Sequence, residues 1–277
     1  MTVLVIGASG QIGRFLLPRL TAGGIDYLPI SRNAVPGDPH WLLGGLPDAM
    51  PDLPPLRAVV SLGPLDHLAP WLSATRLAGT PHIIATSSMS AETKRDSDVP
   101  AERELSRRLR DAETTLIATC ASRGMPWTLF RPTLIYGAGM DKSLTPIVHA
   151  ALRRRIFPIP AGRGQRQPVH ADDIAAGIVA ALVSPFARGK MFPIGGGERM
   201  SVADMFRRAR RSAGGATLPA PIPRFALQLA ARALPALRGP VDRLDSDLIA
   251  DNRELERILG VYPRPFHPAP ETWRPSH

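Results

Sequence analysis

The N-terminal half of the chain alternates short apolar runs with stretches of helical periodicity. Residues 2–6 (TVLVI) predict a buried strand, and apolar positions Ile12, Phe15, Leu16 and Leu20 then recur at helical spacing. Further strands are predicted over 25–30, 41–43, 57–62, 82–86 and 127–131, and helices over about 67–78 and 101–122. Strands that alternate with helices connect by right-handed crossovers, so this pattern predicts a doubly wound, mostly parallel α/β sheet.

Beyond Tyr136 the pattern loosens, and short predicted helices alternate with loops rich in proline and glycine. We therefore expect a sheet domain over residues 1–140, completed by later segments such as 168–195, and a smaller C-terminal substrate-binding or capping lobe over 141–277. A helix near 225–237 is strongly apolar. We interpret it as a core-facing or lobe-capping helix, with a membrane surface or a partner as alternatives.

A glycine turn joins the first strand to the first helix. In Gly7-Ala-Ser-Gly-Gln-Ile-Gly13, glycine allows unusual backbone angles at Gly7 and Gly10 and close packing of the helix at Gly13. The helix start also presents unpaired N–H groups and a positive dipole end to a phosphate. This strand–turn–helix context predicts a dinucleotide site of the Rossmann type, and the turn residues Ser9, Gln11 and Ile12 are included in it.

In a parallel sheet, ligands lie at the carboxyl ends of the strands. The segments expected there are Ser31-Arg32, Leu62-Gly63, Thr86 to Ser90 and Arg131 to Tyr136. The end of the second strand bears on the choice of cofactor. NAD-binding proteins place an acidic residue there, whereas this chain has Ser31 and Arg32, and Asp26 comes too early. An arginine complements the extra phosphate of NADP, and Arg14 could assist, so NADP(H) is favoured over NAD(H).

The formal net charge of +10 over 277 residues raises the possibility of nucleic-acid binding. The charge is almost entirely arginine, scattered over predicted helices, and aromatic residues make up 5% of the chain. Because basic and aromatic residues do not alternate as in base-stacking surfaces, nucleic acid is not an expected partner. We expect a small-molecule substrate instead, and the oligomeric state stays open.

Cysteine content and hydropathy narrow the class of protein further. Cys120 is the single cysteine, so no intramolecular disulfide or cysteine-based metal cage is possible, and we expect no metal site. The chain enters its first strand directly, without the features of a signal peptide, and no apolar run is long enough for a transmembrane segment. A cytoplasmic protein is therefore expected.

Four segments, taken in order, resemble the extended short-chain dehydrogenase/reductase family, in particular its nucleotide-sugar epimerase and dehydratase group. They are Gly7 to Gly13, Thr86-Ser-Ser-Met-Ser90, Arg131-Pro-Thr-Leu-Ile-Tyr-Gly137 and Val169-His-Ala-Asp-Asp-Ile-Ala175, and 259–265 looks like the family's C-terminal segment. The resemblance implies that Ser88 hydrogen-bonds the reacting hydroxyl or carbonyl group. It also implies that Pro132 lies near the nicotinamide and that Arg166 contacts a substrate diphosphate.

The aspartates of the fourth segment, Asp172 and Asp173, are interpreted as candidates for a helix N-cap, and His170 as a packed residue and not a base. The substrate that the resemblance implies is polar and possibly linked to a nucleotide. These residue roles come from the family, because the loop-rich second lobe does not itself name a substrate.

The chain departs from the family at the catalytic Tyr-x-x-x-Lys pair, whose two positions fall on Leu105 and Leu109. None of the three tyrosines has a lysine four residues later. Ser90 and Lys94 have that spacing, but we place them in a loop and regard the spacing as chance. Since leucine cannot exchange a proton, the donor would have to be Ser88, Tyr136 or a bound water.

Two functions remain open on the sequence. One is an atypical NADP(H)-dependent oxidoreductase or epimerase, in which the protein positions substrate and supplies a proton. The other is a catalytically silent NADP(H)-binding sensor or accessory protein, for which loss of the pair with retention of the glycine turn is expected. A sugar dehydratase would need an acidic residue beside the serine, whereas Met89 follows Ser88.

Overall fold

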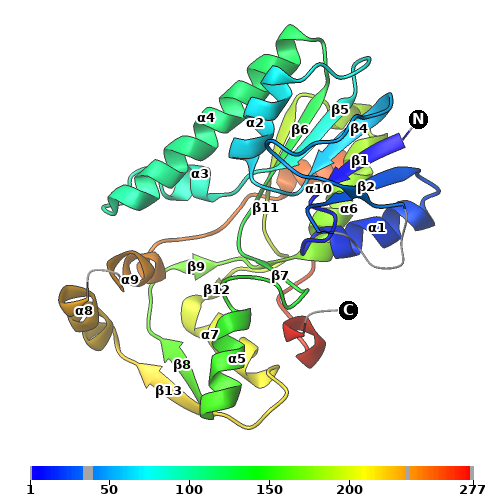
Figure 1. The fold of residues 1–277 in the computed structure, drawn as a ribbon. Helices are drawn as coiled ribbons and strands as arrows, with labels where there is room; N and C mark the ends of the chain where they lie inside the picture. Colours follow the sequence, from blue (N-terminus) through cyan, green and yellow to red (C-terminus); the bar gives the residue numbers. More distant parts are fainter. Residues whose placement is uncertain (1, 34–39, 235–236, 275–277) are drawn as a thin grey trace.

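The computed structural model describes residues 2–33, 40–234 and 237–274, which form a large sheet domain and a smaller lobe below it (Figure 1). A seven-stranded sheet, parallel throughout, has the order β11-β6-β5-β4-β1-β2-β3. Its strands are β1 (Thr2–Ile6), β2 (Tyr27–Ser31), β3 (Leu42–Leu43), β4 (Leu56–Ser61), β5 (His82–Thr86), β6 (Trp127–Pro132) and β11 (Lys190–Ile194). The predicted Rossmann-type doubly wound sheet is confirmed.

Helices cover both faces of the sheet. One face carries α1 (Gly13–Ala22), α6 (Ala171–Val183) and α10 (Arg253–Leu259), and the other carries α2 (Leu65–Ala74) and α4 (Pro100–Ser122). Along β1, Val3 and Val5 belong to the first core, whereas Leu4 and Ile6 belong to the second. Successive side chains of a strand point to opposite faces, so the apolar run from Val3 to Ile6 is what a strand buried on both sides requires.

Several element boundaries differ from the predicted ones. The second strand begins at Tyr27, not at residue 25. Helix α2 begins at Leu65 and ends at Ala74, because the backbone of Thr75 is extended (ψ 136°). Ser90, predicted to lie in a loop, instead begins the short helix α3 (Ser90–Thr93), whereas Lys94 lies in the turn directly after it. Helical periodicity alone specifies such ends poorly, since local backbone angles decide them.

The smaller lobe is built from paired short strands and helices. Its strands pair as β7 (Ile135–Tyr136) with β10 (Val169–His170), β8 (Ile156–Pro160) with β13 (Leu218–Ile222), and β9 (Gln165–Arg166) with β12 (Met200–Ser201). Its helices are α5 (Thr145–Arg154), α7 (Val202–Arg211), α8 (Arg224–Ala233) and α9 (Arg238–Asp245), with 3-10 turns η1 (Pro185–Ala187) and η3 (Pro270–Trp273) elsewhere. The chain returns to the large domain with α6 and β11, and the boundary near residue 140 stays a prediction.

Helix α8 corresponds to the apolar helix expected near 225–237, although residues 235–236 lie outside the described residues. It packs against α9, and Phe225 and Leu229 on it are exposed. Within residues 2–33, 40–234 and 237–274, the model contains no helix with both the length and the apolar character that crossing a bilayer requires.

Candidate functional site

The glycine turn has the geometry that its sequence predicts. Gly7 has a positive φ of 79°, and its carbonyl accepts a 2.9 Å hydrogen bond from the N–H of Gly10. A Cβ added at Gly13 would lie 2.0 Å from the carbonyl oxygen of Ala8. The turn therefore needs a left-handed residue at its first glycine and no side chain at its third, where helix α1 meets the turn.

Polar groups at this turn fit the phosphates of a dinucleotide. Helix α1 begins after Ile12 without a side-chain cap, so the positive end of its dipole lies at the glycine turn. Two buried side-chain atoms, Gln11 Oε1 and Arg14 Nε, have no hydrogen-bond partner among the described residues. Because buried polar atoms are normally paired, these two mark a place where a polar ligand belongs. Ser9, exposed in the turn, adds a hydroxyl group.

The end of β2 lies against the glycine turn. Ser31 Oγ is 3.5 Å from Ser9 Oγ, and Arg32 follows with an exposed side chain. The stem of Arg32 packs over Gly45, where an added Cβ would lie 2.6 Å from Arg32 Cγ. Asp26 precedes the strand at its amino end, so it lies away from the turn, as expected. The guanidinium is therefore the charged group that follows β2 at the cofactor end.

A groove of about 470 Å³ runs along the carboxyl ends of β4 and β5 and brings the predicted cofactor residues together. Ile12, Leu62, Gly63 and Thr86 line it. Leu105 and Leu109 of α4 also line it, so the two positions that would carry the family's acid–base pair face the groove as leucines. The titratable residues of this lining are Asp66, His67 and Arg108.

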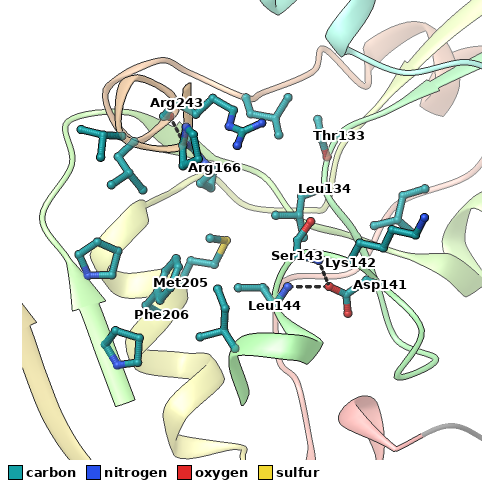
Figure 2. Close-up of a pocket in the computed structure, with 18 of the residues that line it drawn as sticks. Thr133, Leu134, Asp141, Lys142, Ser143, Leu144, Arg166, Met205, Phe206 and Arg243 are labelled. Atoms are coloured by element: carbon teal, nitrogen blue, oxygen red, sulfur yellow. Dashed lines mark hydrogen bonds between the residues drawn. The ribbon is translucent and has the colours of Figure 1, made fainter. Parts of the chain in front are cut away.

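A second cavity, of about 880 Å³, lies between the sheet domain and the smaller lobe (Figure 2). Gln11, Ser88 and Thr133 line it at the sheet end, and the smaller lobe supplies most of the remaining wall. Ile135 lines both this cavity and the groove. Pro132, at the end of β6, is buried beneath this junction, where its carbonyl accepts the N–H of Met89 at 3.0 Å. The large cavity thus opens onto the dinucleotide turn.

Ser88 and its neighbour Ser87 have different surroundings. Ser88 Oγ accepts a 3.1 Å hydrogen bond from the N–H of Ser90, which leaves its hydroxyl hydrogen available to donate into the cavity. Ser87 Oγ instead donates to Glu113 Oε1 at 2.6 Å. Of the two serines, only Ser88 lines the large cavity, and its hydrogen bond to a reacting hydroxyl or carbonyl group stays a prediction.

The ion pair between Glu113 and Arg131 contacts the serine segment on the side away from the cavity, through Ser87. Glu113 of α4, 3% exposed, accepts hydrogen bonds from both Ser87 and Arg131, and the Arg131 Nε contact is 2.8 Å. Arg131 also pairs with Glu92 at 2.7 Å. The hydrogen bond to Glu113 raises the pKa of Arg131, which stays charged. In the sequence Arg131 is only a motif residue, and the signal for its partner is a glutamate on the buried face of α4.

Lys94 is a second residue to which the sequence pattern assigned no role. Together with Ser88 and Ser90 it lines the large cavity, and its Nζ is 3.5 Å from Glu102 Oε1. Arg243 of α9 contacts the same carboxylate oxygen at 3.1 Å. Glu102 therefore connects the serine segment of the sheet domain to the smaller lobe at the edge of the cavity.

Arg166 lies in the wall of the cavity but is 6% exposed. Its guanidinium donates to the carbonyl oxygens of Gln165 at 2.9 Å and Ser246 at 2.6 Å, and also to that of Arg243. Burial lowers the pKa of this side chain. In the structure these hydrogen bonds hold β9 against the end of α9. Contact between Arg166 and a substrate anion stays a prediction.

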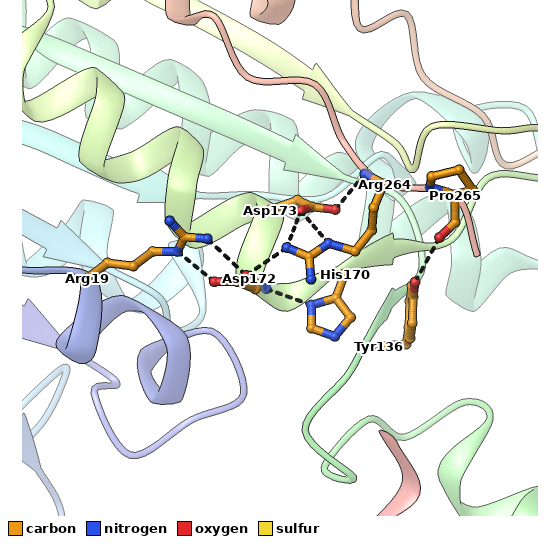
Figure 3. Close-up of polar contacts among 7 residues, drawn as sticks. All are labelled: Arg19, Tyr136, His170, Asp172, Asp173, Arg264 and Pro265. Atoms are coloured by element: carbon orange, nitrogen blue, oxygen red, sulfur yellow. Dashed lines mark hydrogen bonds and ion pairs between the residues drawn. The ribbon is translucent and has the colours of Figure 1, made fainter. Parts of the chain in front are cut away.

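Tyr136 lies in the core of the smaller lobe, 1% exposed. Its hydroxyl donates to the carbonyl of Pro265 at 3.4 Å, and its ring packs edge-on against His170 and Phe266, with ring centres 5.0 and 4.8 Å apart (Figure 3). Burial raises the pKa of this hydroxyl. Because Tyr136 does not line the large cavity, it is not a candidate proton donor.

His170 corrects the expected N-cap of α6. The cap is His170 itself, whose Nδ1 accepts the N–H of Asp172 at 3.1 Å, while Asp172 and Asp173 form ion pairs with arginines (Figure 3). The aspartates lie inside the helix because the extended residue before it is the histidine (ψ 137°). Burial lowers the pKa of His170 to about 4, so the ring is a neutral, packed residue, as expected.

Comparison with known proteins agrees with this geometry. Residues 77–195 match the model of the NAD dependent epimerase/dehydratase family. A UDP-glucose 4-epimerase from Vibrio cholerae is 26% identical over 156 residues, which span 55% of this chain and 47% of the epimerase. An NAD(P)H azoreductase from Xenophilus azovorans is 24% identical over 227 residues, which span 76% of this chain and 74% of the azoreductase.

Among solved structures, the UDP-glucuronic acid 4-epimerase of Bacillus cereus, in complex with UDP-glucuronic acid and NAD, superposes with a TM-score of 0.68. The identity is 16%, and the match covers 95% of this chain and 94% of that one, so this likeness concerns the fold. Over residues 77–195 the chain is therefore similar to the NAD dependent epimerase/dehydratase family, and its Rossmann-type fold is like that of the Bacillus cereus epimerase.

Proposed function

We propose that this protein is an NADP(H)-dependent oxidoreductase whose small-molecule substrate occupies the large cavity. The observation that carries the proposal is the lining of that cavity. Gln11 of the dinucleotide turn and Ser88 at the end of β5 belong to one wall, so a bound substrate would meet both cofactor and serine. An epimerase, which oxidises and then reduces its substrate, would use the same two cavities.

The preference for NADP(H) rests on the end of β2. Arg32 supplies a cation there, and the described residues that end and directly follow β2, Ser31 to Asn33, include no carboxylate of the kind with which NAD-binding proteins accept a ribose hydroxyl. Arg14, whose Nε is buried and has no partner among the described residues, is a second candidate contact for a phosphate. The name of one relative, NAD(P)H azoreductase, is compatible with a reductase that accepts the phosphorylated cofactor.

The chemistry available to the chain's own residues is limited. A bound nicotinamide would supply or accept the hydride, and the protein has to orient the substrate and handle a proton. Ser88 can donate a hydrogen bond to a carbonyl oxygen, since its own acceptor contact is already made by the N–H of Ser90. With leucine at positions 105 and 109, the proton itself would come from water or from the serine hydroxyl.

The same leucines favour a second candidate, a cofactor-binding protein that does not turn over. A groove whose acid–base positions are apolar can hold a dinucleotide without activating a substrate. In that case the protein would signal whether a dinucleotide is bound, and the smaller lobe would pass this signal to a partner.

One set of measurements separates these functions. The purified protein is titrated with NADPH and with NADH by fluorescence, and the absorbance of the reduced nicotinamide is then followed with ketones, aldehydes and azo compounds. We expect NADPH to bind more tightly and to be oxidised with at least one class, and Ser88→Ala to slow turnover while leaving NADPH binding intact. Binding without turnover would favour the silent protein, and no binding of either nucleotide would refute both.

A further inference from the structure

The wall of the large cavity is apolar over most of its extent. Residues of α5, β8, α7, β13 and α8 contribute it, among them Leu144, Pro158, Met205, Phe206, Ile222 and Leu227 (Figure 2). Such a wall gains free energy by covering apolar surface and offers little to a sugar or a nucleotide base. This conflicts with the polar, possibly nucleotide-linked substrate that the family resemblance implies.

Most charged groups around the cavity are already engaged, and the exception is Lys142, which is exposed and has no hydrogen bond or ion pair among the described residues. Asp141 Oδ1 accepts the N–H groups of Ser143 at 2.9 Å and Leu144 at 2.6 Å, so it caps the start of α5. Arg166 is held by backbone carbonyls, and Lys94 and Arg243 share Glu102. A diphosphate would have to displace these contacts, and losing a buried partner is costly.

Three hydroxyl groups that line the cavity have no acceptor among the described residues: Ser88 and Ser90 at the sheet end, and Ser143 just before α5. Ser88 and Ser90 follow β5 beside the dinucleotide turn, whereas Thr133 Oγ already donates to the carbonyl of Gln167. The cavity therefore has a hydrogen-bonding end where the nicotinamide would lie and an apolar body within the smaller lobe. This polarity fits a molecule with one reactive oxygen on an apolar skeleton.

We infer that the substrate is a ketone or secondary alcohol carried on an apolar skeleton, bound with its oxygen toward Ser88 and its hydrocarbon body against Met205, Phe206 and α8. The inference rests on the proposed oxidoreductase function. In the reducing direction a hydride from the nicotinamide goes to the carbonyl carbon and a proton from water goes to its oxygen, which balances the step. A nucleotide sugar would meet a mostly apolar wall and one unpaired cation, Lys142, so the apolar ketone fits the cavity better.

Binding of a probe tests the inference without turnover. Isothermal titration calorimetry on the full chain, with NADPH present and again without it, would use menthone as the apolar ketone and UDP-glucose as the nucleotide sugar. The key variant is Leu227→Glu, which places a charge in the cavity wall. The matched control is Leu229→Glu on the same helix, because Leu229 is 64% exposed and lies outside the lining.

We expect menthone to bind the wild type and Leu229→Glu equally, and Leu227→Glu at least about tenfold more weakly. UDP-glucose should neither bind nor displace menthone. The inference is overturned if menthone does not bind, if Leu227→Glu binds it as the wild type does, or if UDP-glucose displaces it. Failure of the proposed function would appear separately, as absence of NADPH binding in the fluorescence titration with NADPH alone.

Discussion

Arg264, in the segment that follows α10, forms a 2.7 Å ion pair with Asp172 in the first turn of α6 (Figure 3). Asp172 also accepts from Arg19 of α1 at 2.6 Å, and Arg264 contacts the neighbouring Asp173 at 2.8 Å. This cluster ties the C-terminal segment, α6 and α1 together immediately beside the dinucleotide turn. The side chain of Asp173 is 8% exposed, so its charge depends on Arg264.

Replacing Arg264 by alanine should destabilise the fold by roughly 2 kcal/mol, because Asp173 would remain buried without its cation. The free energy of unfolding from urea denaturation measures this. Arg253→Ala is the control, since that arginine pairs with Asp251 while 88% exposed, and no measurable change is expected. Equal effects of the two variants would contradict a structural role for the cluster.

Arg32→Ala should weaken NADPH binding by about tenfold or more while leaving NADH binding nearly unchanged, since a charge-assisted contact to a phosphate would be lost. Fluorescence titration of both nucleotides provides the comparison. The side chain of Arg32 is exposed, so the variant should fold as the wild type does. If both nucleotides lose affinity equally, the assignment of Arg32 to the extra phosphate is wrong.

Gly63→Ala separates cofactor binding from folding. A Cβ at Gly63 meets no atom within 4 Å, so the thermal midpoint should not change, but the methyl group would enter the groove and reduce NADPH affinity by about tenfold. Gly13→Ala offers the contrast, because its Cβ would lie 2.0 Å from a carbonyl oxygen. That variant should lose roughly 1–3 kcal/mol of stability as well as binding. Unchanged NADPH affinity in Gly63→Ala would move the cofactor out of this groove.

Glu113→Gln should lower the free energy of unfolding by roughly 1–3 kcal/mol, because Arg131 would keep only its pair with the exposed Glu92. It should also disturb the Ser87–Ser88 segment and so reduce turnover. Glu104→Gln, on the same helix, breaks an exposed pair with Arg107 and should change neither property. An equal loss of unfolding free energy in both variants would show that burial of the Glu113–Arg131 pair does not determine its contribution to stability.

The stability of the fold should decrease as the pH falls from 6.5 toward 4. Burial lowers the pKa of His82 to about 4 from its ordinary 6.5, and His82 Nε2 lies 2.9 Å from Thr128 Oγ, which donates to the carbonyl of Ala187. The unfolded chain therefore takes up a proton in this range that the folded chain does not, which costs roughly 1–2 kcal/mol. His82→Gln keeps a donor and removes the titration, so urea midpoints measured at several pH values should show a weaker pH dependence. His170, whose pKa is also lowered to about 4, accounts for a part that persists.

Much of the sheet domain could be predicted because its signals are local. The apolar run of β1, the glycines of the turn and the alternation with helices each follow from neighbouring residues, and the structure has them in the predicted order. The sequence also has leucine at positions 105 and 109. That these leucines line the groove follows from the position of α4 beside β5. Ends of helices were less predictable, since α2 stops where the backbone of Thr75 becomes extended.

By itself, the sequence determined the doubly wound sheet and the glycine turn, because each depends on residue types within one element and its turn. It also has Leu105 and Leu109 where the family resemblance implies an acid–base pair. Only the tertiary structure decided what surrounds the substrate. Residues from distant elements, such as Phe206 and Leu227, form one apolar wall, and Glu113, Arg131 and Ser87 meet although they lie on different strands and helices. Contacts between segments far apart in the chain depend on packing, which periodicity and short motifs do not encode.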